Sequence, residues 1–147
     1  MAPSQTGRLG EVYRFAVNEP RPDLILVSDT HRRVVIVEAK TNISQLSNAN
    51  QRSKTASMFI DLKTQLVSLT SNEYWKARCN YAFHLGLLWG PSTVDDHELS
   101  SLIRSYSAEI SEAKESILCI SGGIIENQLS YNTFQGIRMR RPDWFTF

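Results

Sequence analysis

Two acidic residues and one lysine stand at informative positions in the first third of the chain. Asp23 follows Pro22 at the start of an apolar stretch, and Glu38 and Lys40 close the next apolar stretch after fourteen intervening residues. Two carboxylates held close together repel each other, and burial favours protonation of one of them. A divalent cation removes that conflict, and carboxylate oxygens suit Mg²⁺ or Mn²⁺. Asp23 and Glu38 are therefore predicted ligands of such a metal.

The lysine and the residue before it extend this prediction. Hydrolysis of a phosphodiester requires an activated water, neutralisation of charge on the phosphate oxygens and assistance to the departing oxygen. Lys40 would orient the attacking water or balance charge in the transition state. The backbone carbonyl of Ala39, which lies between the two key residues, is a candidate additional metal ligand.

The elements that position these groups follow from the apolar pattern. The runs DLILVS and RVVIVEAK, separated by DTHR, predict a β-hairpin with both faces covered. If the turn centres on Thr30-His31, the numbers of facing residues sum to 61, and Asp23 faces Glu38 on the same side of the sheet. Lys40 projects to that side too, because strand side chains repeat every two positions. A slip of one residue would move Asp23 to the opposite face.

The rest of the chain reads as one domain, residues 1–147, of the α/β (α+β) class. The pattern predicts helices over 8–17, 47–71 and 95–114 and strands over 78–89 and 117–121, followed by a short helix and a final strand or arm. The predicted order is α-β-β-α-β-α-β, with the helices lying against a small mixed sheet.

The stretch RPDLILVSDTHRRVVIVEAK resembles the signature of the PD-(D/E)xK nuclease superfamily. The resemblance implies a restriction endonuclease-like fold, a mixed central β-sheet flanked by helices in α-β-β-β-α-β order. It also implies that Asp23 and Glu38 ligate the metal and that Lys40 assists the water. The family's preceding helix often supplies another acidic residue, for which Glu11 is the match. One core strand of the family has no clear counterpart, unless a short strand lies near 13–19.

Candidate contacts to nucleic acid lie in two basic segments. The start of the large helix and the C-terminal tail contribute Gln51, Arg52, Lys54, Arg138, Arg140 and Arg141. Residues 1–90 hold eleven Lys and Arg against seven Asp and Glu, and residues 91–137 hold two against seven. This asymmetry favours one phosphate-facing side. An ordinary solvated surface would produce the same pattern, so both interpretations stay open.

Other classes of protein receive little support from the sequence. The three histidines, His31, His84 and His97, have no spacing typical of zinc ligands. No apolar run approaches the roughly 20 residues that cross a bilayer, and the N-terminal segment lacks the apolar stretch of a signal peptide. We therefore expect a soluble, intracellular protein, cytoplasmic or nuclear rather than secreted, with no membrane partner.

These observations predict a metal-dependent endonuclease that hydrolyses phosphodiester bonds, with DNA as the expected substrate. Cutting both strands of a duplex requires two such centres, so a homodimer is expected for that reaction. Two alternatives stay open. One is an inactive nuclease-like module that binds nucleic acid or protein, and the other is an RNA-cleaving endonuclease domain of a larger polymerase or mobile-element protein.

Overall fold

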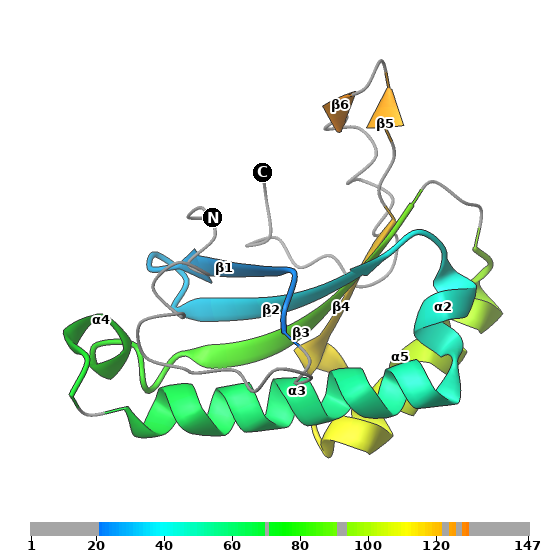
Figure 1. Cartoon of the computed structure of the whole chain (residues 1–147). Helices are drawn as coiled ribbons and strands as arrows, with labels where there is room; N and C mark the ends of the chain where they lie inside the picture. Colours follow the sequence, from blue (N-terminus) through cyan, green and yellow to red (C-terminus); the bar gives the residue numbers. More distant parts are fainter. Residues whose placement is uncertain (1–20, 70, 91–93, 122–123, 126–127, 130–147) are drawn as a thin grey trace.

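The computed structural model describes residues 21–69, 71–90, 94–121, 124–125 and 128–129. Figure 1 shows the arrangement of the elements along the chain. In chain order they are β1 (Leu24–Ser28), β2 (Arg33–Lys40), α2 (Ile43–Ser47), α3 (Ala49–Ser68), α4 (Glu73–Lys76), β3 (Ala82–Trp89), α5 (Asp96–Ile110), the 3₁₀ turn η1 (Lys114–Ser116), β4 (Ile117–Ser121), β5 (Ile124–Ile125) and β6 (Gln128–Leu129).

The four longer strands form one mixed sheet in the order β1-β2-β3-β4. Strands β1 and β2 are antiparallel, while β3 runs parallel to both β2 and β4. The predicted mixed α/β class is confirmed. The predicted hairpin register is confirmed as well, because Leu24 faces Val37 and Ile25 faces Ile36, and each pair sums to 61.

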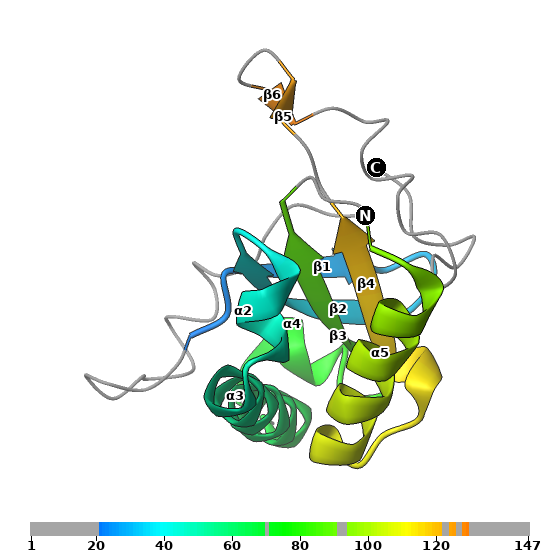
Figure 2. The ribbon, with the colours of Figure 1, turned by 90° about the vertical axis from the view of Figure 1, so that its right-hand side faces the viewer.

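The two long helices, α3 and α5, lie side by side against one face of the sheet (Figure 2). Strand side chains alternate between faces. Val34 and Ile36 therefore join the core beneath the helices, and Val35 and Val37 join a smaller apolar cluster on the other face. All four side chains are buried. Strand β2 is thus covered on both faces, as its unbroken apolar run predicts.

The predicted helix over 47–71 corresponds to α3, and the short helix α2 that precedes it was not predicted. Asn48 has extended backbone angles, and its side chain accepts hydrogen bonds from the backbone N–H groups of Asn50 and Gln51. Such an N-cap satisfies donors that the first turn of a helix leaves unpaired. Helix α2 starts only three residues after Lys40, and α3 then runs back beneath the sheet. The start of α3 lies beside the end of β2, because Gln51 and Lys54 line the same cavity as Lys40.

The other elements follow the sequence pattern with three exceptions. The short helix α4 was not predicted, β3 starts at Ala82 rather than near residue 78, and α5 ends early. Helix α5 stops at Ile110 rather than near residue 114, because Ser111 adopts the left-handed conformation with φ of 55° and caps the helix. The predicted helix over 8–17, the short strand near 13–19 and the segment after residue 129 lie outside the described residues. Among the described residues, no helix has the length and apolar character needed to cross a membrane.

Candidate active site

The C-terminal end of β2 places Glu38 and Lys40 on the helix-facing side of the sheet. The Glu38 residue is 7% exposed, and its Oε1 atom lies 3.4 Å from Nζ of Lys40. The two side chains meet because they are two positions apart on one strand. Each charge therefore has a partner in a place where an isolated charge would be costly.

Asp23 immediately precedes β1 and is held beside this pair by two hydrogen bonds. Its backbone N–H donates to the carbonyl of Val37 at 3.0 Å, and its Oδ2 accepts from the backbone N–H of Ala39 at 2.8 Å. The residue is exposed, whereas Glu38 is buried. The hairpin thus brings the three predicted residues Asp23, Glu38 and Lys40 to one end of the sheet.

The surroundings of Glu38 raise the pKa of its carboxyl above the usual value. Burial is the largest cause, and the negative charge of Asp23 is the second. The charge and hydrogen bond of Lys40 act in the opposite direction but do not cancel these effects. Burial and the neighbouring carboxylate therefore both disfavour the charged form of Glu38.

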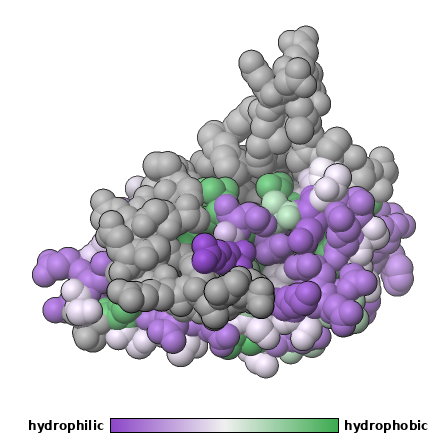
Figure 3. Space-filling model, in the orientation of Figure 1, coloured by the Kyte–Doolittle hydropathy of each residue, from purple (hydrophilic) through white to green (hydrophobic). Residues whose placement is uncertain are grey.

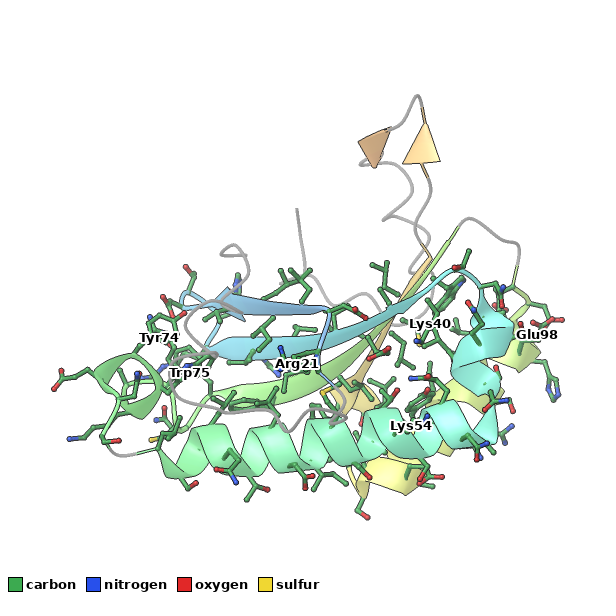
Figure 4. The ribbon with its side chains drawn as sticks, viewed as in Figure 1. Arg21, Lys40, Lys54, Tyr74, Trp75 and Glu98 are labelled. Carbon is green, nitrogen blue, oxygen red and sulfur yellow. The ribbon has the colours of Figure 1, made fainter. Side chains whose placement is uncertain are left out.

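A cavity of about 600 Å³ opens beside these groups, lined by Arg21, Asp23, Glu38, Lys40, Gln51, Lys54 and Thr55. Figure 4 shows Lys40 at the end of β2, Lys54 below it on α3, and Arg21 farther to the left. Three cationic side chains thus surround the two carboxylates. Gln51 and Lys54 were predicted from the sequence to contact nucleic acid, and both reach this cavity.

A second hollow of about 450 Å³ lies next to the first and shares Lys40, Gln51 and Lys54 with it. Its other lining residues are polar and come from α2 and the start of α3, namely Ser44, Gln45, Asn48 and Asn50. Figure 3 shows hydrophilic residues gathered over this part of the molecule. The cavity therefore continues into a neutral, polar surface.

Arg52, which was predicted with Gln51 and Lys54 to contact nucleic acid, does not line this cavity. Its guanidinium Nε lies 3.4 Å from Oε1 of Glu109, and its NH1 donates to the carbonyl of Ser47 at 3.2 Å. It lines a separate hollow between α2 and α5. One step along a helix rotates a side chain by about 100°, which carries Arg52 away from its neighbour Gln51. Four other predicted residues, Glu11, Arg138, Arg140 and Arg141, lie outside the described residues.

Two residues of the cavity were missed by reading the sequence. Arg21 directly precedes the Pro-Asp pair, and this position is the only feature of the sequence that could have identified it as part of the site. Thr55 lies one helical turn after Gln51, and its hydroxyl accepts a hydrogen bond from Gln51 Nε2 at 2.9 Å. Thr55 is only 1% exposed, so it forms part of the cavity floor.

Oxygen atoms dominate the possible metal ligands at this site. They are the carboxylates of Asp23 and Glu38, with the carbonyl of Ala39 between Glu38 and Lys40. Within the described part of the chain, no group of three or more His, Cys, Asp or Glu side chains could hold a metal ion. A cation here would thus require neutral oxygen ligands and water in addition to the two carboxylates.

Two of the three histidines, His31 and His84, make hydrogen bonds within the fold. The ring of His31 hydrogen-bonds to the Ser28 hydroxyl in the hairpin turn. His84 is buried on β3 beside Arg33, whose NH1 lies 2.9 Å from His84 Nε2. Burial, and then the charge of Arg33, lower the pKa of His84 to about 4. A neutral imidazole accepting from a guanidinium is a packing arrangement rather than a zinc site.

Comparison of the chain with protein-family models, with curated proteins and with solved structures finds no match in any of the three.

Proposed function

We propose that this chain is a divalent-metal-dependent endonuclease of the PD-(D/E)xK type that hydrolyses phosphodiester bonds in DNA. The observation that carries the proposal is the composition of one cavity. A buried Glu38, a neighbouring Asp23 and the paired Lys40 line it together with the cations Arg21 and Lys54. Two close carboxylates suit a cation, and the surrounding basic groups suit a polyanion.

The donor set fits Mg²⁺ or Mn²⁺ in type. Both acidic side chains offer oxygen, and a cation between them would relieve the repulsion that Asp23 exerts on Glu38. Asp23 and Glu38 would hold the metal, with the Ala39 carbonyl as a further ligand. When bound, the metal supplies Lewis acidity to the phosphate and lowers the pKa of a water.

The remaining chemistry falls to side chains of the chain itself. Lys40 can donate hydrogen bonds to the attacking water or to a phosphate oxygen, since its ammonium already lies at the carboxylate of Glu38. Arg21 and Lys54 would contact the phosphates and fix the substrate in the cavity. The Asp23 carboxylate is oriented by the N–H of Ala39, which ties the loop before β1 to the catalytic strand.

The order of elements supports the assignment to this family. An antiparallel hairpin, a long helix and a strand parallel to the second hairpin strand follow one another, as the last four elements of the family's α-β-β-β-α-β core do. The first helix and strand of that core have no counterpart among the described residues. The restriction endonuclease-like fold is therefore part of the proposal.

Cleavage assays on defined substrates test this function. The chain would be incubated with supercoiled plasmid, linear duplex, branched DNA and single-stranded RNA, with Mg²⁺ or with EDTA. We expect DNA cleavage that EDTA abolishes and that Lys40→Ala and Asp23→Asn both remove. Asp61→Asn is the matched control, because Asp61 is an exposed acid on α3 that does not line the cavity.

Each alternative has its own outcome in these assays. Cleavage of RNA alone would favour the RNA-cleaving alternative. Metal-independent binding without cleavage of any substrate would favour an inactive module. Activity that survives both EDTA and Lys40→Ala would exclude the proposed mechanism. The expected homodimer is tested by asking whether double-strand cuts depend on protein concentration.

A further inference from the structure

The ammonium group of Lys40 is the cation that already accompanies the buried acid of the cavity. Its Nζ lies 3.4 Å from Oε1 of Glu38, and the Glu38 side chain is 10% exposed whereas that of Lys40 is 31% exposed. The other carboxylate has a different partner, because Oδ2 of Asp23 accepts from the backbone N–H of Ala39 at 2.8 Å. A metal bound by Glu38 would therefore place a second cation against a carboxylate that already has one.

Two cations at one carboxylate repel each other. A divalent ion bound by Asp23 and Glu38 would lie within a few ångströms of the Lys40 ammonium, so the lysine either weakens metal binding or moves away. Movement is open to this side chain. Lysine has a flexible four-carbon stem, and Lys40 lies at the end of β2 with part of that stem in solvent, so it can change rotamer without displacing the strand.

The second hollow provides a different position for the Lys40 side chain. Lys40 lines both hollows, whereas Glu38 lines only the catalytic cavity. The described residues that line the second hollow are two lysines and five neutral polar residues, and none of them is acidic. Figure 4 shows the second of these lysines, Lys54, on α3 below Lys40. Two ammonium groups in one hollow without an acid favour the binding of an anion there, and a nucleic acid supplies phosphates.

We propose that Lys40 is an internal counter-ion, which pairs with Glu38 in the metal-free protein and contacts a substrate phosphate in the second hollow when a metal is bound. The inference rests on the proposed nuclease function and describes how the same site is loaded. A lysine released from Glu38 is available to the phosphate, and a lysine held by the phosphate no longer opposes the metal. Such coupling is reciprocal, so metal and nucleic acid should each strengthen the binding of the other.

Calorimetric titration of the full chain with Mn²⁺, without nucleic acid, tests the first half of the proposal. Lys40→Met should bind Mn²⁺ about fivefold or more tightly than the wild type, because the competing cation is gone. Lys40→Arg keeps the positive charge and should bind Mn²⁺ as the wild type does. Unchanged or weaker Mn²⁺ binding by Lys40→Met would overturn the proposal.

Lys54→Met is the matched control for this titration. Lys54 lines the same cavity, but it forms no ion pair with an acid of the described residues. Its removal should therefore change the Mn²⁺ affinity much less than removal of Lys40. Equal gains in the two variants would show a general effect of positive charge, and the specific role of the Lys40–Glu38 pair would be refuted.

The second half is tested by repeating the titrations with a saturating phosphorothioate DNA duplex, whose backbone resists hydrolysis. The gain in Mn²⁺ affinity that the duplex causes should be about fivefold or more larger in the wild type than in Lys40→Met. A metal that touches the phosphate directly raises the affinity of both proteins, so the difference between the two gains isolates Lys40. Equal gains would refute the coupling.

A charge introduced into the second hollow tests where the phosphate lies. Asn50 lines the second hollow but not the catalytic cavity, and it is the second residue of α3, where an acid is compatible with the helix. Asn50→Asp should weaken binding of the same duplex in Mn²⁺ by about two- to fivefold, as an exposed like charge does. Asn80→Asp, an exposed position before β3, should leave it unchanged. Equal effects would place the phosphate elsewhere.

The two levels of the proposal can fail separately. A wild type that cleaves with metal, together with Lys40→Met that binds Mn²⁺ no more tightly, would refute this inference alone. A wild type that neither binds Mn²⁺ nor cleaves any substrate would refute the nuclease function and this inference together.

Discussion

Glu38 lies where burial disfavours a negative charge. The effect of this charge on the free energy of unfolding should be measurable in the absence of any substrate. Burial and Asp23 raise the pKa of Glu38 in the folded state. Between the ordinary carboxyl pKa and this raised value, the folded chain binds more protons than the unfolded chain. The contribution of Glu38 to the free energy of unfolding is therefore largest in acid, and it is lost as pH rises through the raised pKa.

Glu38→Gln should consequently stabilise the protein near neutral pH while abolishing cleavage. The neutral amide avoids the burial cost of the charge and the repulsion from Asp23. Urea unfolding at several pH values from acid to neutral measures the effect, as a higher free energy of unfolding that varies less with pH. Asp61→Asn serves as the exposed control. A variant less stable than the wild type at neutral pH would contradict this account of the site.

Lys40 should matter more for chemistry than for the fold. Lys40→Met keeps an unbranched apolar chain but removes the ammonium that lies 3.4 Å from Glu38. We expect the cleavage rate to fall by about 10²- to 10³-fold, the typical loss of one preorganised charge at a reacting phosphate or carbonyl. Single-turnover rates with saturating DNA measure it. A loss confined to substrate affinity would instead make Lys40 a binding residue.

The sequence predicted the residues of the site well where strand geometry controls them. Asp23, Glu38 and Lys40 could be placed together because a hairpin has one register and strand side chains repeat every two positions. Thr55 could not be found, because it occupies an ordinary buried position of α3. Helical spacing gives no sign that its side chain lines a cavity.

At the scale of elements, the β2–β3 junction, where Gly90 after β3 contacts Thr41 after β2, sets the position of the site. Gly90 follows β3, and its N–H donates to the carbonyl of Thr41, one residue beyond Lys40. A Cβ atom at Gly90 would lie only 2.5 Å from that carbonyl oxygen. Gly90→Ala must therefore displace the backbone next to Lys40, and it should lower stability by about 1–3 kcal/mol, the usual cost of overpacking.

Gly86→Ala provides the comparison for this prediction. A Cβ at Gly86 would lie 2.9 Å from Cγ1 of Val35, on the other face of the sheet. Both variants should unfold at lower urea concentration, but only Gly90→Ala should also slow cleavage under conditions where the protein is fully folded. Equal cleavage rates in the two folded variants would show that the β2–β3 junction does not position Lys40.

The elements themselves were largely predictable, and the exceptions have local causes. Continuous β-branched runs and helical spacing identified all four strands of the main sheet and both long helices. The short helix α2 was missed because its five residues are too few to show a helical repeat. The end of α5 was missed because a left-handed serine at position 111 carries no strong signal.

At the scale of the whole molecule, the distribution of charge predicts where nucleic acid binds. The cavity with Arg21, Lys40 and Lys54 lies between β2 and α3, whereas Lys76 ends α4 at the opposite end of the sheet (Figure 1). Each phosphate contact made by a cation releases counterions from DNA. The logarithm of the affinity therefore falls linearly with the logarithm of the salt concentration, and the slope is proportional to the number of contacts. Cations near the cavity should therefore contribute to the salt dependence of binding, and distant ones should not.

Lys54→Ala should reduce the slope of log affinity against log salt by about 1, because it removes one phosphate contact. Lys76→Ala should leave the slope unchanged, since an exposed lysine far from the cavity adds charge without a contact. The titrations would use the Glu38→Gln background, so that DNA is bound without being cut. Equal slopes for the two variants would mean that DNA does not lie over the cavity. Because the slope counts contacts whatever the base sequence, this result would locate the bound strand even before any preferred sequence is identified.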